Sequence, residues 1–280
     1  MKKTLGLALG SGGSRGVAHI GFLRALEETG VKPDFITGTS MGAVVGAAYA
    51  SGLTTGEMKQ AVFSLRLLDL LTFTGKRGGV SGTKKMRELL IKYIGDITFK
   101  DLKIPFRCYA VDMISQQLIE FSSGSVVDAV VASASIPVVF HPLEKDGMRL
   151  IDGGVLERVP VSQVKQMGAD VVVGVDVLGH RDASEDAPNV LKMLIETIDI
   201  MDNHRTARRK EDFEQLIDFW LEPELGNMSQ YDLKQIRFAY EKGYELGQKN
   251  ANEIRKALKR PHTATKRKLT VTVKEKKKEE

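Results

Sequence analysis

The sequence lacks the features of a secreted or membrane-spanning protein. Cys108 is the single cysteine among 280 residues, so no disulfide can form within the chain, and it is interpreted as a small buried apolar side chain. No stretch approaches the roughly 18 to 20 consecutive apolar residues of a transmembrane helix. The apolar run after Lys2 and Lys3 is short and is not followed by a small-residue cleavage site. We therefore expect a cytoplasmic protein without a transmembrane anchor.

Most of the chain also lacks an excess of charge. The formal net charge is +5, but residues 259–280 carry nine Lys or Arg and three acidic residues, a net +6, which leaves −1 for the rest. We expect one domain over residues 1–260 and a basic, disordered tail over residues 261–280. Such a tail is usually solvated; contact with an anionic membrane surface is an alternative, and no nucleic acid is expected as a partner. Nothing in the sequence indicates an oligomeric state.

Apolar runs and helical patterns alternate along the chain. Short apolar runs that end at glycine or at charged residues predict strands, and amphipathic or fully apolar segments predict helices. This alternation is typical of a three-layer α/β/α sandwich around a mainly parallel central sheet. A hydrophilic loop is expected over residues 179–189. The expected strands are 4–9, 34–38, 106–112, 117–121, 149–152 and 170–177, and the expected helices are 15–30, 41–52, 83–94, 125–134, 160–167, 190–210 and 232–257.

A serine flanked by glycines, GTSMG at residues 38–42, lies between a predicted strand and a predicted helix. A sharp strand-to-helix turn projects its central residue above the sheet, where a serine can attack a carbonyl group. Gly38 and Gly42 meet the need for small residues on both sides of that turn. The motif predicts Ser40 as a nucleophile; taken alone, it also fits an ordinary turn with Ser40 as a capping hydroxyl.

A second glycine-rich segment, GSGGSRG, follows the first predicted strand. It does not fit the dinucleotide-binding pattern G-x-G-x-x-G, because Arg15 stands where the third glycine belongs, and it lacks the lysine of a phosphate-binding loop. Unpaired backbone N–H groups at the start of a helix can bind an anion. Beside a nucleophilic serine, the segment is interpreted as an oxyanion hole, with a simple tight turn as the alternative.

No histidine stands out as the base for Ser40. Of the five histidines, His19 lies in an amphipathic helix, where a structural role is more common, and three others lie in hydrophilic segments or in a charged helix. His141 in VVFHPL is the strongest candidate. Asp152, by contrast, ends an apolar predicted strand and precedes Gly153 and Gly154. A carboxylate at such a strand end can approach a serine hydroxyl, although Asp-Gly is also a common turn signal.

Several of these segments, taken together and in order, resemble the patatin-like phospholipase family. The resemblance is to its short bacterial members, which are related to the catalytic domain of neuropathy target esterase. It covers roughly residues 5–177. The matching segments are GLALGSGGSRGVAHIGFLRALEE, GTSMGAVVGAAYASG, TFKDLKIPFRCYAVD, ASASIPVVFHPL and LIDGGVLERVPV.

The resemblance implies a Ser–Asp dyad without a catalytic histidine. Ser40 would attack the ester carbonyl and Asp152 would accept its proton, through an acyl-enzyme intermediate. Backbone amides around three residues, Gly12, Gly13 and Ser14, would stabilise the oxyanion, with Arg15 as the family's basic residue beside them. No metal or organic cofactor is implied. The glycines that complete the family motifs are Gly10, Gly16, Gly38, Gly42, Gly153 and Gly154.

Two residues depart from the family pattern. Ser11 stands where glycine is common, and we expect little effect because serine is small and keeps its amide. Arg158 stands where asparagine is common. Its positive charge could act on the dyad or select an acidic head group; a plain surface arginine is the alternative.

The segment 58–73 is rich in apolar residues, with eight of them in the twelve positions 62–73. It is interpreted as a cover over an acyl-chain groove or as a patch for peripheral membrane contact, with an ordinary core helix as the alternative. The family resemblance implies a lipid acyl ester, such as a phospholipid or lysophospholipid, as the substrate. A hydrolase of small soluble esters and a regulatory protein on the same fold are the alternatives.

Overall fold

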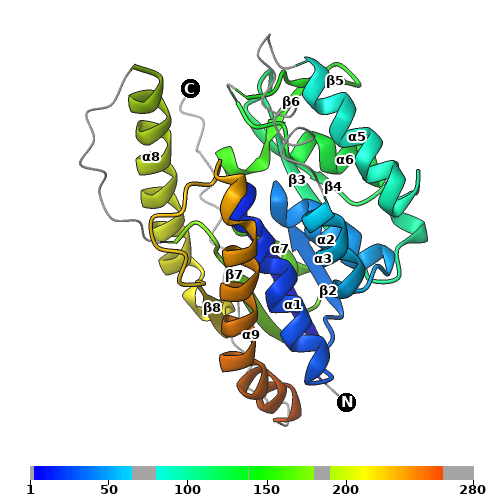
Figure 1. Cartoon of the computed structure of the whole chain (residues 1–280), viewed down its shortest axis with the longest axis vertical. Helices are drawn as coiled ribbons and strands as arrows, with labels where there is room; N and C mark the ends of the chain where they lie inside the picture. Colours follow the sequence, from blue (N-terminus) through cyan, green and yellow to red (C-terminus); the bar gives the residue numbers. More distant parts are fainter. Residues whose placement is uncertain (1–2, 65–79, 138, 180–189, 261–280) are drawn as a thin grey trace, which may run out of the picture.

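The computed structural model describes residues 3–64, 80–137, 139–179 and 190–260 (Figure 1). Within these ranges one eight-stranded sheet has the order β5-β6-β3-β2-β1-β7-β8, with β4 paired to β3. The pairs from β3 through β2, β1 and β7 to β8 are parallel, and β4, β5 and β6 add antiparallel pairs. The strands are β1 (Leu5–Leu9), β2 (Phe35–Gly38), β3 (Phe106–Asp112), β4 (Gln117–Phe121), β5 (Leu143–Lys145), β6 (Met148–Asp152), β7 (Val171–Val175) and β8 (Phe219–Leu221).

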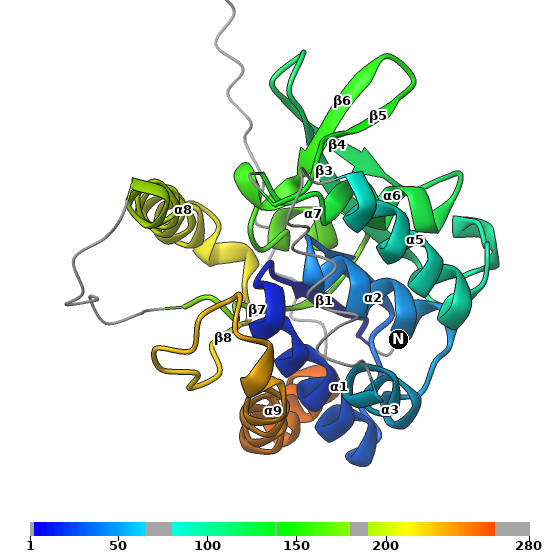
Figure 2. The same ribbon diagram turned by 45° about the horizontal axis from the view of Figure 1, so that its top comes forward.

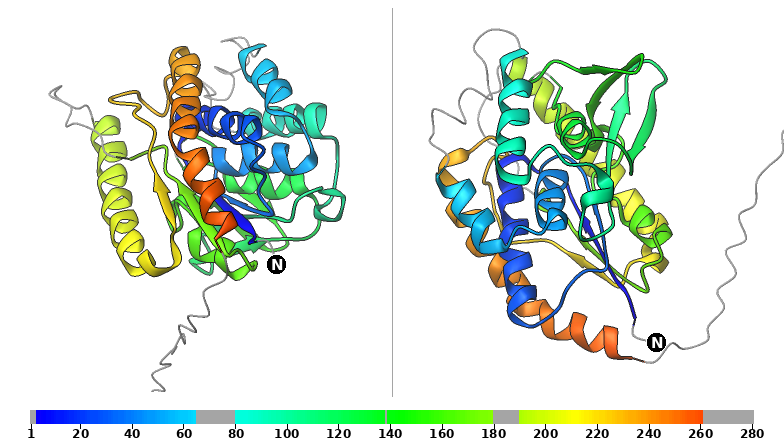
Figure 3. Two further views of the ribbon diagram at one scale, coloured as in Figure 1. Left: turned by 90° about the horizontal axis from the view of Figure 1, so that it is seen from below. Right: turned by 90° about the vertical axis from the view of Figure 1, so that its right-hand side faces the viewer.

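Helices cover both faces of this sheet (Figure 3). Successive side chains of a strand point to opposite faces, and β1 is buried on both. Its leucines belong to a large apolar core shared with α1, α2, α5, α6 and α9, whereas Ala8 packs in a second cluster with α7. The described helices are α1 (Ala18–Glu28), α2 (Met41–Ser51), α3 (Thr55–Ser64), α5 (Val80–Ile94), α6 (Val126–Ser133), α7 (Val161–Gln166), α8 (Val190–Asp212) and α9 (Ile236–Lys259).

The predicted α/β/α sandwich with a mainly parallel sheet is confirmed. The expected strands and helices are present close to their expected bounds. Two strands were not predicted, β5 and β8, and each has three residues, too few to show a periodic pattern. The segment 58–73 is described as far as Ser64, and the tail 261–280 and nearly all of the loop 179–189 lie outside the described residues. Among the described helices, none is both long and apolar enough to cross a membrane.

Figures 1 and 2 show α8 beyond the β8 end of the sheet, on the opposite side of the molecule from α5. β1 pairs in parallel with both β2 and β7, so the carboxyl ends of these three strands lie at the same edge of the sheet. In such a sheet, the residues that follow the strand ends are the usual place for a site.

Candidate active site

The sheet brings the ends of β2 and β6 together. β4 pairs with one edge of β3 over residues 108–112, so β2 and β6 share the other edge. β2 runs parallel to β3 and ends at Gly38 beside Cys108, whereas β6 runs antiparallel and ends at Asp152 beside Ala110. The two strands run toward each other, so the turn after Gly38 meets Asp152.

Ser40 occupies a strained turn between β2 and α2. Its φ of 55° and ψ of −122° lie where side chains are disfavoured. A Cβ atom on Gly38 would lie 2.4 Å from the Gly42 carbonyl oxygen, and one on Gly42 would lie 2.1 Å from the Leu9 carbonyl oxygen. Both motif positions therefore require glycine. Ser40 makes no capping hydrogen bond to α2, so its hydroxyl does not serve as a helix cap.

Asp152 is a buried carboxylate in contact with Ser40. It is 6% exposed, and it accepts a hydrogen bond from the Gly154 amide at 2.7 Å. The Ser40 side chain lies close enough to the carboxyl group to lower its pKa. Burial raises the pKa of Asp152 from 3.8 to about 7, against the lowering effect of the Ser40 side chain and the Gly154 amide, and the charge of Asp202 raises it further. Near neutral pH the carboxylate can therefore both accept and release a proton.

Two residues at and just after the end of α6 accept hydrogen bonds from the backbone amides of Ser40 and Asp152. The Ser40 amide donates to Ser133 Oγ at 3.0 Å, and the Asp152 amide donates to the Ser135 carbonyl oxygen at 2.9 Å. Ser133 and Ser135 are fully buried. Sequence reasoning missed both, because small residues at the end of an apolar helix carry no signal of such contacts. A Cβ atom on Gly153 would lie 2.2 Å from the Tyr109 carbonyl oxygen, so this glycine lets the turn lie close to β3.

The glycine loop leads from β1 through a 3₁₀ turn into α1. The Ser14 amide donates to the Gln230 carbonyl oxygen at 2.9 Å, and the Arg15 amide donates to the Gly12 carbonyl oxygen at 3.0 Å. The expectation of three oxyanion amides, those of Gly12, Gly13 and Ser14, is therefore corrected for Ser14, because its amide already has an acceptor. The amides of Gly12 and Gly13 have no acceptor within the part of the chain that the structure describes.

The Arg15 side chain anchors the loop from beneath. It is 1% exposed, and it donates to the carbonyl oxygens of Val177 at 2.6 Å, Met228 at 2.9 Å and Gly226 at 3.1 Å. These bonds tie the loop to the chain after β7 and to the segment before α9. The expectation that a basic side chain lies beside the oxyanion is therefore wrong for Arg15, because its guanidinium group donates to backbone carbonyl oxygens instead.

His19 supports the same loop as a structural residue, as predicted. Its Nε2 atom lies 2.8 Å from the Gly10 carbonyl oxygen, and burial lowers the pKa of His19 to about 4, so the ring is neutral. His141 and His204 are exposed, and His180 and His262 lie outside the described residues.

The remaining motif glycines allow close packing around the site. The Gly10 amide donates to the Val175 carbonyl oxygen at 2.9 Å and so continues the pairing of β1 with β7. A Cβ atom on Gly16 would lie 2.4 Å from Cγ of Met41, and one on Gly154 would lie 2.6 Å from Oγ of Ser11. The loop therefore packs against the start of α2 and against the turn after Asp152.

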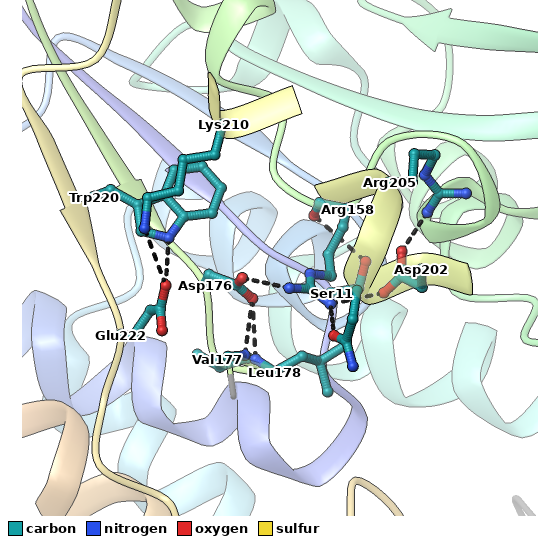
Figure 4. A network of polar contacts seen from close by, with 12 residues as sticks. Ser11, Arg158, Asp176, Val177, Leu178, Asp202, Arg205, Lys210, Trp220 and Glu222 are labelled. Carbon is teal, nitrogen blue, oxygen red and sulfur yellow. Dashed lines mark hydrogen bonds and ion pairs between the residues drawn. The ribbon is translucent and has the colours of Figure 1, made fainter. Parts of the chain in front are cut away.

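Arg158 is not a surface residue, which corrects one of the two expectations for it. Its side chain is buried and forms ion pairs with Asp176 at 2.6 Å and Asp202 at 2.9 Å (Figure 4). It also donates to Asn203 Oδ1 at 2.7 Å. Sequence reasoning missed these acidic partners, because Asp202 lies in a charged helix whose pattern resembles a solvated surface.

An apolar cavity of about 280 Å³ lies beside Ser40. Gly13 and Ser14 line it together with Ser40, and apolar side chains of α2, α3 and α5 make up much of the remaining wall. Met58 and Val62 of α3 are among them. The described part of the segment 58–73 therefore lines a cavity that reaches Ser40, and the rest of the segment lies outside the described residues.

Comparison with known proteins identifies relatives of this chain. The family model described as patatin-like phospholipase matches residues 7–165. An uncharacterized NTE family protein of Mycobacterium bovis is 35% identical over 188 residues, which cover 66% of this chain and 52% of that protein. Lysophospholipase NTE1 of Coccidioides immitis is 34% identical over 181 residues, which cover 62% of this chain and 12% of that protein. The chain thus spans about half the length of the mycobacterial relative.

Solved structures share the fold at low sequence identity. VipD from Legionella pneumophila has a TM-score of 0.60 at 16% identity, over 90% of this chain and 67% of that chain. A chain of the ExoU–SpcU complex from Pseudomonas aeruginosa has a TM-score of 0.52 at 17% identity, over 90% of this chain and 52% of that chain. The family model covers more than half of the sequence, and this chain therefore belongs to the patatin-like phospholipase family.

Proposed function

We propose that this chain hydrolyses carboxylic esters of lipids, with Ser40 as nucleophile and Asp152 as base. One observation carries the proposal: a serine on a strained turn lies at the wall of an apolar cavity and next to a buried carboxylate. The cavity suits an acyl chain, because it offers apolar surface next to the attacking hydroxyl. The relatives named lysophospholipase support a phospholipid with a single acyl chain as the substrate class.

In the first half-reaction, Ser40 Oγ attacks the carbonyl carbon while its proton passes to Asp152. The Gly12 and Gly13 N–H groups stabilise the resulting oxyanion, and loss of one such donor typically costs about 10²–10³ in rate. The tetrahedral intermediate then collapses, and the bond from the carbonyl carbon to the alcohol oxygen breaks. The departing alcohol takes the proton from Asp152, and the acyl group remains as an ester on Ser40.

In the second half-reaction, water replaces the alcohol. Asp152 removes a proton from a water molecule as its oxygen attacks the acyl carbon, and the same two amides stabilise the second oxyanion. The bond to Ser40 Oγ breaks, Ser40 regains a proton from Asp152, and the fatty acid leaves. A pKa of about 7 lets one carboxyl group accept and return the proton in both steps.

The proposal is tested by covalent labelling with a long-chain alkyl fluorophosphonate, with the site of the label found by peptide mass spectrometry. Label is expected on Ser40 in the wild type, none on that peptide in Ser40→Ala, and strongly slowed labelling in Asp152→Asn. Ser51→Ala is the matched control, because Ser51 ends the same helix and its hydroxyl donates to the Ala48 carbonyl oxygen. A folded wild type that is never labelled would leave a binding or regulatory protein.

The substrate class is tested with a series of esters of increasing acyl length. We expect kcat/KM to rise with chain length until the cavity is filled, and expect monoacyl phospholipid to release free fatty acid. Activity that falls steadily from acetyl esters upward would contradict the lipid assignment and favour a hydrolase of small soluble esters.

A further inference from the structure

A network of alternating charges lies between β7, the glycine loop and α8 (Figure 4). At its centre, Arg158 is 5% exposed, and its guanidinium group pairs with Asp176 and Asp202. Asp202 also pairs with Arg205, three residues further along α8. Asp176 in turn accepts hydrogen bonds from the Leu178 and Gly179 amides, at 3.1 and 3.4 Å. We call Asp176, Arg158, Asp202 and Arg205 the charged network.

The charged network is attached to the backbone on both sides of the candidate active site. The Arg158 carbonyl oxygen accepts the Ser11 N–H at 3.0 Å, which fixes the start of the glycine loop. Arg205 donates to the carbonyl oxygens of Gly154, at 2.7 Å, and of the residue after it. Gly154 is the residue whose amide donates to the Asp152 carboxylate. The network therefore connects the turn after Asp152 with the loop that carries Gly12 and Gly13.

We propose that Arg158 and Arg205 are positioning residues for ester hydrolysis, which hold the Asp152 turn in register with the glycine loop. This inference rests on the proposed function. A buried ion pair contributes little net stability compared with apolar side chains of similar volume, because its groups lose their hydration. Its contribution here is geometry, and a displacement of about 1 Å at a reacting group can cost about 10²-fold in rate.

The charged network also acts on Asp152 through Asp202. After burial, the Asp202 charge is the second influence that raises the pKa of Asp152, and Arg158 and Arg205 offset that charge. The other groups that face Asp152, the Ser40 hydroxyl and the Gly154 amide, are neutral. Removing Arg158 therefore strengthens the repulsion and raises the pKa of Asp152, whereas removing the Asp202 charge lowers it.

The test measures kcat, KM and the pH midpoint of kcat/KM on one soluble ester, with the fluorophosphonate labelling rate of Ser40 as a second readout. The variants are Arg158→Met, Arg158→Lys, Arg205→Met and Asp202→Asn. Arg208→Met is the matched control, because Arg208 is an exposed arginine on the same helix. Circular dichroism and thermal melting show which variants are folded. Arg205→Met decides the question if Arg158→Met does not fold, since the Arg205 side chain is 30% exposed.

We expect Arg158→Met and Arg205→Met to lose about 10- to 100-fold in kcat with unchanged KM. The pH midpoint should rise in Arg158→Met and fall in Asp202→Asn, a pair of opposite shifts that general loosening of the fold would not produce. Arg158→Lys keeps the positive charge but cannot contact Asp176 and Asp202 through two separate nitrogens. The pH midpoint of this variant should therefore remain that of the wild type while its kcat falls.

Two results would overturn the inference. The first is wild-type kcat in folded Arg158→Met and Arg205→Met; the second is an equal loss in Arg208→Met. If Ser40 of the wild type is labelled and these variants behave like the wild type, the positioning role fails and the proposed function stands. A wild type without label overturns both.

Discussion

Replacing Asp152 with asparagine removes a titrating carboxyl group and keeps a side chain of the same shape. Burial raises the pKa of this carboxyl group from 3.8 to about 7. A carboxyl group with a raised pKa holds its proton more tightly in the folded chain than in the unfolded chain. Its contribution to stability is therefore full below pH 3.8 and is lost as the pH rises to about 7.

The size of this loss follows from the shift. The pKa rises by about three units, each unit corresponds to about 1.36 kcal/mol, and Asp152 is 6% exposed, so about 4 kcal/mol is lost across this window. Asparagine resembles the neutral acid at every pH. Asp152→Asn should therefore be as stable as the wild type near pH 4 and more stable by up to about 4 kcal/mol above pH 7.

Urea unfolding at several pH values, followed by the fluorescence of Trp220, measures this difference. Other groups titrate in both proteins, and their effects cancel when the two free energies of unfolding are subtracted. In parallel, kcat/KM of the wild type should rise with pH and reach its midpoint at about 7, because the base must be ionised. A stability difference that does not change with pH would refute the argument, because Asp152 would then titrate like an exposed carboxylate.

Three further substitutions test the turn and the cavity. The free energy of unfolding of Ser40→Gly should be about 1 kcal/mol higher than that of Ser40→Ala, because relief of about 1–3 kcal/mol of backbone strain exceeds the entropic cost of glycine. Equal stability of the two variants in urea would mean that the turn is unstrained. Gly42→Ala should lose about 1–3 kcal/mol of stability and most of the fluorophosphonate labelling of Ser40, because the new Cβ atom would lie 2.1 Å from a backbone oxygen. A stable and fully labelled variant would argue against this packing. Val62→Trp should fill part of the cavity and move the optimum of the ester series to shorter chains; an unchanged optimum would show that the acyl chain lies elsewhere.

The features that sequence reasoning located are those with strong local causes. β1 and β2 are apolar runs that end at glycine. The turn at Ser40 needs small residues at Gly38 and Gly42, because two backbone oxygens lie within 2.4 Å of the missing Cβ atoms. One of these oxygens belongs to Gly42 in the turn itself, and the other belongs to Leu9 on the neighbouring strand β1. The two glycines are visible in the sequence because they form a short local motif around Ser40.

The features that sequence reasoning missed depend on contacts between distant segments. Arg158 and Asp202 are 44 residues apart, and nothing near either one distinguishes a buried pair from two solvated charges. The Ser14 amide, predicted as an oxyanion donor, meets the Gln230 carbonyl oxygen from a segment that had no assigned role. The amino-acid type of residue 230 does not matter for that contact, since any residue offers a carbonyl group.

Burial of Asp152 explains how a serine could be activated here without histidine. A solvated aspartate has a pKa of about 4 and is therefore too weak a base to take a proton from a serine hydroxyl at neutral pH. Burial and the Asp202 charge bring the pKa of Asp152 to about 7, the range in which histidine normally works. His19, by contrast, loses its basicity by the same burial, which lowers its pKa to about 4. Desolvation disfavours the charged form of both side chains, so in this interior it strengthens the carboxylate as a base and weakens the imidazole.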